Sequence, residues 1–501
     1  MAPVSSISTI SQVFSKLGDN TGSVIPMFVK DFTSNTMTSV TYYKEGGKMD
    51  GPEKTLEEFG TGVVWLGGIP FIKKHVFDSR IFKKYDINPD IDANRLFSGN
   101  NKEHINTLEF AADKAKSLGK EFEEQAGILD KTIKNKSLAK NLALTKFIGA
   151  TAATGAALYG IITLKQKNTE KQIKKELDEK HKKAGYEKNA IKNTSVYQIF
   201  KGKNNPENQN DSSKGPSFKG GLGTFVMTNP IANTAIVDCV IAGTRMKQAR
   251  EGEMFEILFK EASVLAFIYG LAQPLQKGFE ALSMRFLKKP IETDYAVMDS
   301  KAVKEAMEQE KVKSGSSKLM QDAKAIINLA LGKGENTENA AASIADKAKQ
   351  AVKSSDIKNE DAKKVLDFIF NNQDSDIVDV FKKSGNLSTF KTKQGVEQLS
   401  LLSSISVKSL KETAENTVKL LEEGSKSKDV TSFLKKTKFA KGAAIIGNIG
   451  ISALLIGYAQ PKLNLYFRKK RNDGNNTNPA ILAIEKEYEA NLKAKSFQTD
   501  C

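Results

Sequence analysis

The sequence is poor in the residues that metal sites and disulfide frameworks need. It has two cysteines, Cys239 and Cys501, and three histidines, His75, His104 and His181, with no HExxH or CxxC motif among them. These few candidate ligands give no support to a zinc site. Two cysteines also cannot form the disulfide framework of a small secreted domain, so we expect a reducing compartment.

Catalytic signatures are missing as well. The chain contains no GxxxxGK[ST] phosphate loop, no GxGxxG after a strand and no GxSxG elbow. The alternating acidic residues of 86–92 fit a calcium loop poorly, because Ile91 replaces the sharp-turn glycine and Phe97 the bidentate glutamate. We therefore expect a protein that is not an enzyme and holds no cofactor.

Arginine is scarce, although the chain is basic. Seven arginines stand against 69 lysines, and with 59 carboxylates the formal net charge is +17. Lysine gives a point charge without the two-pronged hydrogen bonding of arginine, which favours diffuse attraction to anionic surfaces over reading of base edges. We do not expect nucleic acid as a partner. Lysines that merely solvate helix surfaces would explain the same composition.

Uncharged apolar runs of spanning length are few in a chain whose mean hydropathy is −0.39. Two segments approach the roughly 20 residues that a bilayer requires. They are residues 147–164, bounded by Lys146 and Lys165, and residues 442–461, bounded by Lys441 and Lys462. Their length predicts membrane-spanning helices. Buried helices of a soluble bundle are the alternative.

Small residues recur one helical turn apart in both segments. Such spacing lets helix backbones approach closely in lipid. The predicted helix-packing face consists of Ala152, Ala156, Gly160, Ala443, Gly447, Ala453 and Gly457.

Three weaker apolar segments are residues 59–72, 221–243 and 262–276. The second is broken near Pro230 and contains Asp238, which is the candidate polar site inside the membrane. An ionisable group in lipid normally faces a bundle interior or an aqueous path, so Asp238 is a candidate to hold a cation or relay a proton. If this segment lies outside the membrane, Asp238 is instead a hydrogen-bonded or exposed residue.

Basic residues follow both long segments closely. Near an anionic leaflet they are candidate contacts with lipid phosphates, although a solvated helix explains the same pattern. Because basic residues also precede both segments, the orientation stays open. The candidate contacts are Lys165, Lys167, Lys171, Lys174, Lys175, Arg468, Lys469, Lys470 and Arg471.

Helical periodicity dominates the rest of the chain, so the expected fold class is all-α, with short transmembrane or deeply buried helices and a soluble helical domain. One apolar stripe follows 105–129, and a heptad-like stripe runs from Val407 to Leu421 and ends at Gly424. The expected regions are 1–100 with a short apolar segment, 101–289 as a membrane-associated helical region with a Lys-rich loop at 165–219, 290–436 as the soluble helical domain, and 437–501 as an apolar helix with a basic tail.

Three functions fit this pattern. The first is a non-enzymatic membrane protein with a structural or scaffolding role, whose soluble domain is cytoplasmic and contacts protein partners through helical faces. The second is a small solute or ion transporter or channel with Asp238 in the path. The third is a soluble all-α structural or effector protein whose apolar segments form a buried core.

Overall fold

The structure is a computed structural model that describes residues 24–47, 49–97, 107–183, 227, 230–250, 252–311, 317–331 and 359–499. Almost all of these residues are helical. Within them, strands occur only as one antiparallel hairpin of β1 (Thr389–Lys391) and β2 (Glu397–Leu399), which pairs Thr389 with Leu399. The prediction of an all-α fold is confirmed.

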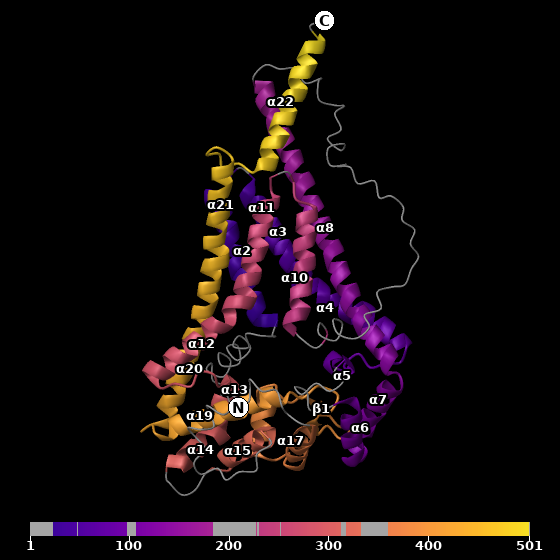
Figure 1. Cartoon of the computed structure of the whole chain (residues 1–501), viewed down its shortest axis with the longest axis vertical. Helices are drawn as coiled ribbons and strands as arrows, with labels where there is room; N and C mark the ends of the chain where they lie inside the picture. The colour runs from indigo at the N-terminus through magenta and orange to yellow at the C-terminus, as the bar shows by residue number, and fades with distance from the viewer. Residues whose placement is uncertain are drawn as a thin grey trace.

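Three parts follow one another along the long axis of the molecule (Figure 1). We call them the helical domain, the bundle and the stalk. The helical domain consists of α5 (Ala93–Phe97), α6 (Leu108–Ser117), η3 (Lys120–Phe122), α7 (Glu123–Lys134), α13 (Tyr295–Met298), α14 (Lys301–Lys311), α15 (Lys318–Leu331), α17 (Asn359–Asn371), α18 (Asp376–Lys383), the β1–β2 hairpin and α19 (Val407–Ser425).

The helical domain has an ordinary apolar core around α19. The stripe predicted for this helix is buried, and the Ser406 hydroxyl caps its first turn by accepting from the Ser409 amide. Gly424 does not end the helix as predicted. It lies inside α19, one residue before the end, against the side chain of Met307, which would have to move to admit a Cβ. Residues 107–135, which we expected in the membrane-associated region, also pack into this core.

The long stripe predicted over 105–129 is not one helix. Gly119 has a φ of +88°, a left-handed conformation that glycine adopts without strain. It ends α6, and the chain turns through η3 into α7. Ile105 lies outside the described residues. The apolar spacing therefore predicted the buried side chains but not the turn between the two helices.

The bundle contains six long helical runs, most of which lie side by side in Figure 1. Three of the runs include π-helical segments, namely η1, η2, η6, η7 and η9, and the other three are single helices. The six runs are α2 (Val24–Glu45); α3 (Asp50–Val63), η1 (Val64–Gly68), α4 (Ile69–Ile72) and η2 (Lys73–Phe82); α8 (Lys136–Lys183); α10 (Pro230–Lys247); α11 (Met254–Leu265), η6 (Ala266–Leu271), α12 (Ala272–Leu282) and η7 (Ser283–Leu287); and α20 (Val430–Ala453), η9 (Leu454–Ala459) and α21 (Gln460–Arg471).

Two of these runs, Lys136–Lys182 and Val430–Arg471, are long and apolar enough to cross a membrane. Only 33% and 22% of their most apolar windows are buried inside the protein. A core helix of a soluble protein would bury most of such a window. The apolar surface of both helices therefore faces outward.

The stalk is formed by the far end of α8 and by α22 (Pro479–Thr499), beyond the bundle (Figure 1). Ile173 and Leu177 of α8 pack against Ile481 and Ile484 of α22. The Tyr488 hydroxyl donates a 2.6 Å hydrogen bond to Asp178, which closes this small apolar contact. One helix, α8, thus runs through all three parts of the molecule.

Candidate functional site

Part of the interior of the bundle consists of charged side chains. In α3 the buried residues are Asp50, Gly51, Glu53, Glu57 and Glu58, and none of them is hydrophobic. Leu56 and Val63 of the same helix are 46% and 71% exposed. The hydrophobic face of α3 therefore points away from the neighbouring helices and its acidic face points toward them.

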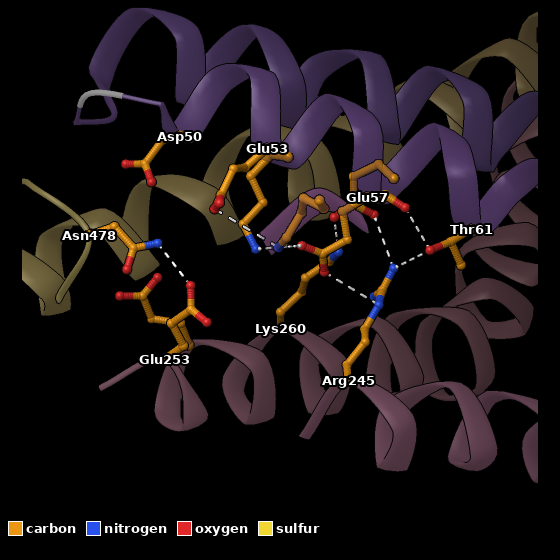
Figure 2. Close-up of polar contacts among 12 residues, drawn as sticks. Asp50, Glu53, Glu57, Thr61, Arg245, Glu253, Lys260 and Asn478 are labelled. Atoms are coloured by element: carbon orange, nitrogen blue, oxygen red, sulfur yellow. Dashed lines mark hydrogen bonds and ion pairs between the residues drawn. The ribbon is translucent and has the colours of Figure 1, made fainter. Parts of the chain in front are cut away.

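In α11, too, the charged face is buried and the hydrophobic face is exposed. Its buried residues are Glu256, Lys260 and Glu261, whereas Phe255 and Leu258 are 43% and 50% exposed. Positions 253, 256 and 260 are spaced three and four residues apart, so their side chains share one face of the helical run. That face meets the acidic stripe of α3 (Figure 2).

We call the ionised side chains between these helices the buried charge network. Its acidic members are Asp50, Glu53, Glu57, Glu58, Glu253, Glu256 and Glu261, and its basic members are Lys54, Lys165, Arg245, Arg250, Lys260 and Arg468. Asp50 begins α3, where its carboxylate accepts from the Gly47 amide at 2.7 Å and a negative charge favours the helix N-terminus.

Arg468 of α21 forms the end of the network nearest the stalk. It is 1% exposed. Its Nε and Nη2 donate to the two oxygens of Glu256 at 2.8 and 2.6 Å, a two-pronged arrangement that fixes both side chains. Its Nη1 donates to Asp50. One guanidinium thus joins α3, α11 and α21.

Arg250 occupies the middle of the network. Its Nη2 donates to Glu53 and to Glu253, both at 2.7 Å. The Asn478 amide donates to the same Glu253 oxygen at 2.9 Å, which brings in the chain before α22. This middle group ties the turn between α10 and α11 to α3.

The group around Arg245 of α10 is the part of the network that lies nearest the helical domain. It donates to Glu261 and, at 2.9 Å, to the Thr61 hydroxyl (Figure 2). Its Nε lies 3.4 Å from Glu57. Nearby, Lys260 donates to Glu58.

Lys165 connects the long helix α8 to this network. Its ammonium donates to Glu57 at 3.0 Å and lies 3.9 Å from Glu53. Lys54 lies 3.4 Å from the same Glu57 oxygen. Five helices are therefore cross-linked by charge in a layer surrounded by apolar side chains.

A small polar cavity lies within the network. It has a volume of about 20 Å³, enough for roughly one water molecule. Lys54, Glu57, Lys165, Arg245 and Glu253 contribute to its lining. Several buried polar atoms of the network accept or donate no hydrogen bond within the protein, among them Asp50 Oδ1, Glu53 Oε1 and Arg250 Nη1. Buried polar atoms of this kind are usually satisfied by water.

Asp238, the candidate intramembrane site, is half-buried on α10. It lies close enough to Asp31 of α2 for the two charges to interact, and Asp31 also interacts with Glu58 and Lys260. Asp238 is therefore a neighbour of the network and not an isolated charge.

The predicted packing face is only partly the one that the structure uses. Ala152 and Ala156 are exposed, and a side chain at Gly160 would meet nothing within 4 Å. The first segment packs through the opposite face instead, where Gly155 lies against Val240. This half of the prediction is wrong, because spacing alone does not say which side of a helix faces its neighbours.

In the second apolar segment the small residues have different surroundings. Gly457 lies against α2, with Ser34 O 2.7 Å from where its Cβ would be, and Ala453 is buried. Gly447 lies beside the ring of Phe279 on α12. Ala443 is exposed.

The predicted anionic-surface contacts fall into three groups by exposure. Lys165 and Arg468 are 6% and 1% exposed and belong to the buried charge network, so the prediction of a surface contact is wrong for both. Lys174 is half-buried and pairs with Glu170 at 2.7 Å. The others lie on the surface: Lys167, Lys171, Lys175, Lys469, Lys470 and Arg471.

Most of the network is missing from the sequence-based prediction. Its acidic stripe on α3 has the spacing of an amphipathic helix, and hydrophobicity patterns are read on the assumption that the polar face is outside. A usable signal was present in the arginines, which are rare in the chain yet occur at 245, 250 and 468, next to apolar segments.

The comparisons identify no relatives. The chain matches no protein-family model, no curated protein and no solved structure.

Proposed function

We propose that this protein is an integral membrane protein with a structural, scaffolding role. In this proposal the bundle lies in the bilayer, and the helical domain is held at one membrane face, where it contacts protein partners. The stalk projects from the opposite face.

The observation that carries the proposal is the inversion of the bundle. Charged side chains occupy a large part of its interior, beside the apolar cluster of Phe147, Leu158, Val237 and Ile241. Large hydrophobic side chains such as Val63, Leu454 and Phe439 are 71%, 54% and 80% exposed. Water would penalise an exposed apolar layer of this extent. Lipid removes that cost, and it also requires charged groups to be paired inside the bundle.

Exposed basic residues lie where a lipid headgroup layer would be. Lys469, Lys470 and Arg471 end α21, and Lys167 and Lys171 follow the apolar segment of α8. Each such residue near an anionic leaflet contributes about 1 kcal/mol of attraction. We therefore expect anionic lipid at the stalk side of the bundle.

Cys239 provides a direct test, because it is exposed on α10 beside Asp238. In the full chain carrying Cys501→Ser, a charged maleimide that does not cross membranes should fail to label Cys239 in intact membranes and label it after denaturation. Alkaline carbonate should leave the protein in the membrane pellet. Rapid labelling in intact membranes together with release by carbonate would exclude the proposed membrane location.

A further inference from the structure

A cavity of about 290 Å³ lies where the bundle meets the helical domain. It is surrounded by η2, the loop 87–92, α5 and the beginning of α8, and both η2 and α5 contact α8 there (Figure 1). Pockets that bind small organic ligands begin at roughly 300 Å³. This cavity therefore has room for more than water, unlike the cavity of about 20 Å³ in the buried charge network.

The inner wall of this cavity is apolar. Its buried residues, each at most 9% exposed, are Phe82, Ile87, Ile91, Leu96, Thr132, Ala139, Ala143 and Phe147. The hydroxyl among them, on Thr132, donates to the Ile128 carbonyl of its own helix at 2.8 Å. A wall of this kind favours an alkyl chain, because contact with the wall removes the chain from water.

Two lysines give the cavity its positive charge. Lys146 lines the cavity and forms an ion pair with Asp78. Lys73, at the start of η2, also lines the cavity and is partly buried. Within the described ranges Lys73 forms no hydrogen bond or ion pair, and the charges that act on it are those of Lys146 and Asp78. Asp78 thus serves two lysines, which leaves one positive charge at the cavity without a counterion of its own among the described residues.

Two aspartates also line the cavity, but they do not neutralise this charge. Asp90 is exposed to solvent. Asp92 acts on the buried guanidinium of Arg95. Neither aspartate is among the groups whose charge acts on Lys73. A cationic ligand would meet both lysines, so the cavity favours an anion.

The cavity lies beside the surface that we place in lipid. Lys73 directly follows the apolar segment 59–72, and Lys146 directly precedes the apolar segment 147–164. On the same elements, Val76 and Ile148 are 39% and 44% exposed. A molecule dissolved in the bilayer would therefore reach the cavity at the depth where its charged group meets water.

We propose that this cavity binds a fatty acid, with the carboxylate at the Lys73 ammonium and the alkyl chain against the apolar wall. One negative charge matches the one uncompensated lysine, and a charged pair that is partly shielded from water is stronger than an exposed pair. A methylene group takes about as much space as a water molecule, about 30 Å³, so the cavity holds roughly ten carbons. A phospholipid with two chains is too large. Binding is non-covalent and leaves the ligand unchanged.

The test uses the full chain in digitonin, a detergent without an alkyl chain. The probe is dodecanoate with a photoreactive diazirine near its methyl end, and the labelled peptides are identified by mass spectrometry. We expect saturable labelling within 82–96 and 132–147. Labelling that rises linearly with the probe and spreads over the outer surface of the bundle would overturn the proposal.

Competitors separate the two parts of the ligand. An excess of plain dodecanoate should remove the labelling. Dodecanol has the same chain without the charge, and inorganic phosphate has charge without the chain, so neither should compete. Competition by dodecanol equal to that by dodecanoate would refute the role of Lys73. Competition by phosphate alone would show an anion site and not a fatty-acid site.

Lys73→Gln should weaken dodecanoate binding at least several-fold. Lys74→Gln is the matched control, because Lys74 is the next residue of η2, is exposed and does not line the cavity. Ala143→Leu fills part of the apolar wall and should also weaken binding, with both lysines intact. Circular dichroism and Tm in digitonin establish that the variants are folded. Folded Lys73→Gln and Ala143→Leu chains that bind like the Lys74→Gln chain would overturn the proposal.

This inference goes beyond the proposed scaffolding role and rests on the membrane location only for the route by which the ligand enters. Release of the chain by carbonate together with saturable, Lys73-dependent labelling would refute the membrane location and leave the site in place. Resistance to carbonate without saturable labelling would refute the site and leave the membrane location in place.

Discussion

Arginine and lysine have different places in this protein. Four of the seven arginines, Arg95, Arg245, Arg250 and Arg468, are at most 7% exposed. Among the lysines that the structure describes, only Lys165, Lys260 and Lys411 are buried. A guanidinium brings five donors in a fixed plane and can satisfy two carboxylates at once. Arginine is thus buried more often than lysine in this protein, although Lys165 and Lys260 also belong to the buried charge network.

Replacing one buried arginine should therefore lower the free energy of unfolding by more than the loss of its own hydrogen bonds would. Arg468→Met leaves Asp50 and Glu256 as buried charges without their main partner, which typically costs about 3–5 kcal/mol. Thermal unfolding in detergent should show a large fall in Tm. Arg471→Met is the control, since Arg471 is exposed and its 3.4 Å contact with Glu256 is secondary. Equal Tm values for the two variants would contradict a structural role for the network.

Two glutamates of α19 make the helical domain sensitive to pH. Burial raises the pKa of Glu415 against the pull of Lys411 and Lys419, and burial also raises the pKa of Glu422 against Lys324 and Lys426. A carboxyl group whose pKa is higher in the folded state stabilises the fold at low pH. That stabilisation is lost as the pH rises through the folded pKa.

We therefore expect the helical domain to unfold at a lower temperature at about pH 8 than at about pH 5. Calorimetry of the full chain should show a smaller difference for the double variant Glu415→Gln, Glu422→Gln. Glu305→Gln should behave as the unaltered chain, because Glu305 forms an exposed pair with Lys301 on α14 at 3.4 Å. An unchanged pH dependence in the double variant would rule out these two groups as its source.

At the scale of whole helices, the crossing of η9 over α2 depends on one glycine. A Cβ at Gly457 would lie 2.7 Å from both Ser34 O and Met37 Cβ, so the backbone of α2 would have to move. Overpacking of this kind costs about 1–3 kcal/mol. Gly450 of α20 has nothing within 4 Å of the same position.

Gly457→Ala should accordingly lower Tm in detergent, while Gly450→Ala should leave it unchanged or raise it through better helix propensity, worth up to about 1 kcal/mol. The two changes add the same methyl group to the same helical run. A similar Tm for both variants would show that η9 and α2 do not cross as tightly as described.

The elements differ in how well the sequence predicts them. Hydrophobic period suffices for α19, because its apolar stripe is the buried one. Apolar length suffices to find the two helices that are long enough to cross a membrane. Both signals fail for α3 and α11, where Glu57 and Lys260 are inside and Leu56 and Leu258 outside. Which face of such a helix is buried depends on charges contributed by helices distant in sequence, and Arg245 and Arg468 are nearly 200 and more than 400 residues from their partners on α3. No local pattern contains that pairing.

For the molecule as a whole, the decisive property is its outer surface. Leu454 is 54% exposed within the apolar layer, and Val396 is equally exposed on the β1–β2 hairpin of the helical domain. If the layer lies in lipid, a charge at position 454 opposes insertion by about 2.5–3.5 kcal/mol near the centre of the bilayer. At position 396 a charge only meets water.

Leu454→Arg should therefore reduce the amount of protein recovered in membranes, and Val396→Arg should not. Quantitative immunoblots of membrane and soluble fractions would measure the difference. Improved solubility of Leu454→Arg, with the fold retained, would indicate instead that this surface meets water.

The length of α8 has a mechanical consequence. Its 48 residues form one rod of about 72 Å, which touches the helical domain at its beginning and α22 near its end. A straight helix resists bending far more than the loops around it. A force that tilts the stalk would therefore also move the beginning of α8. The helical domain would be displaced directly through this one helix.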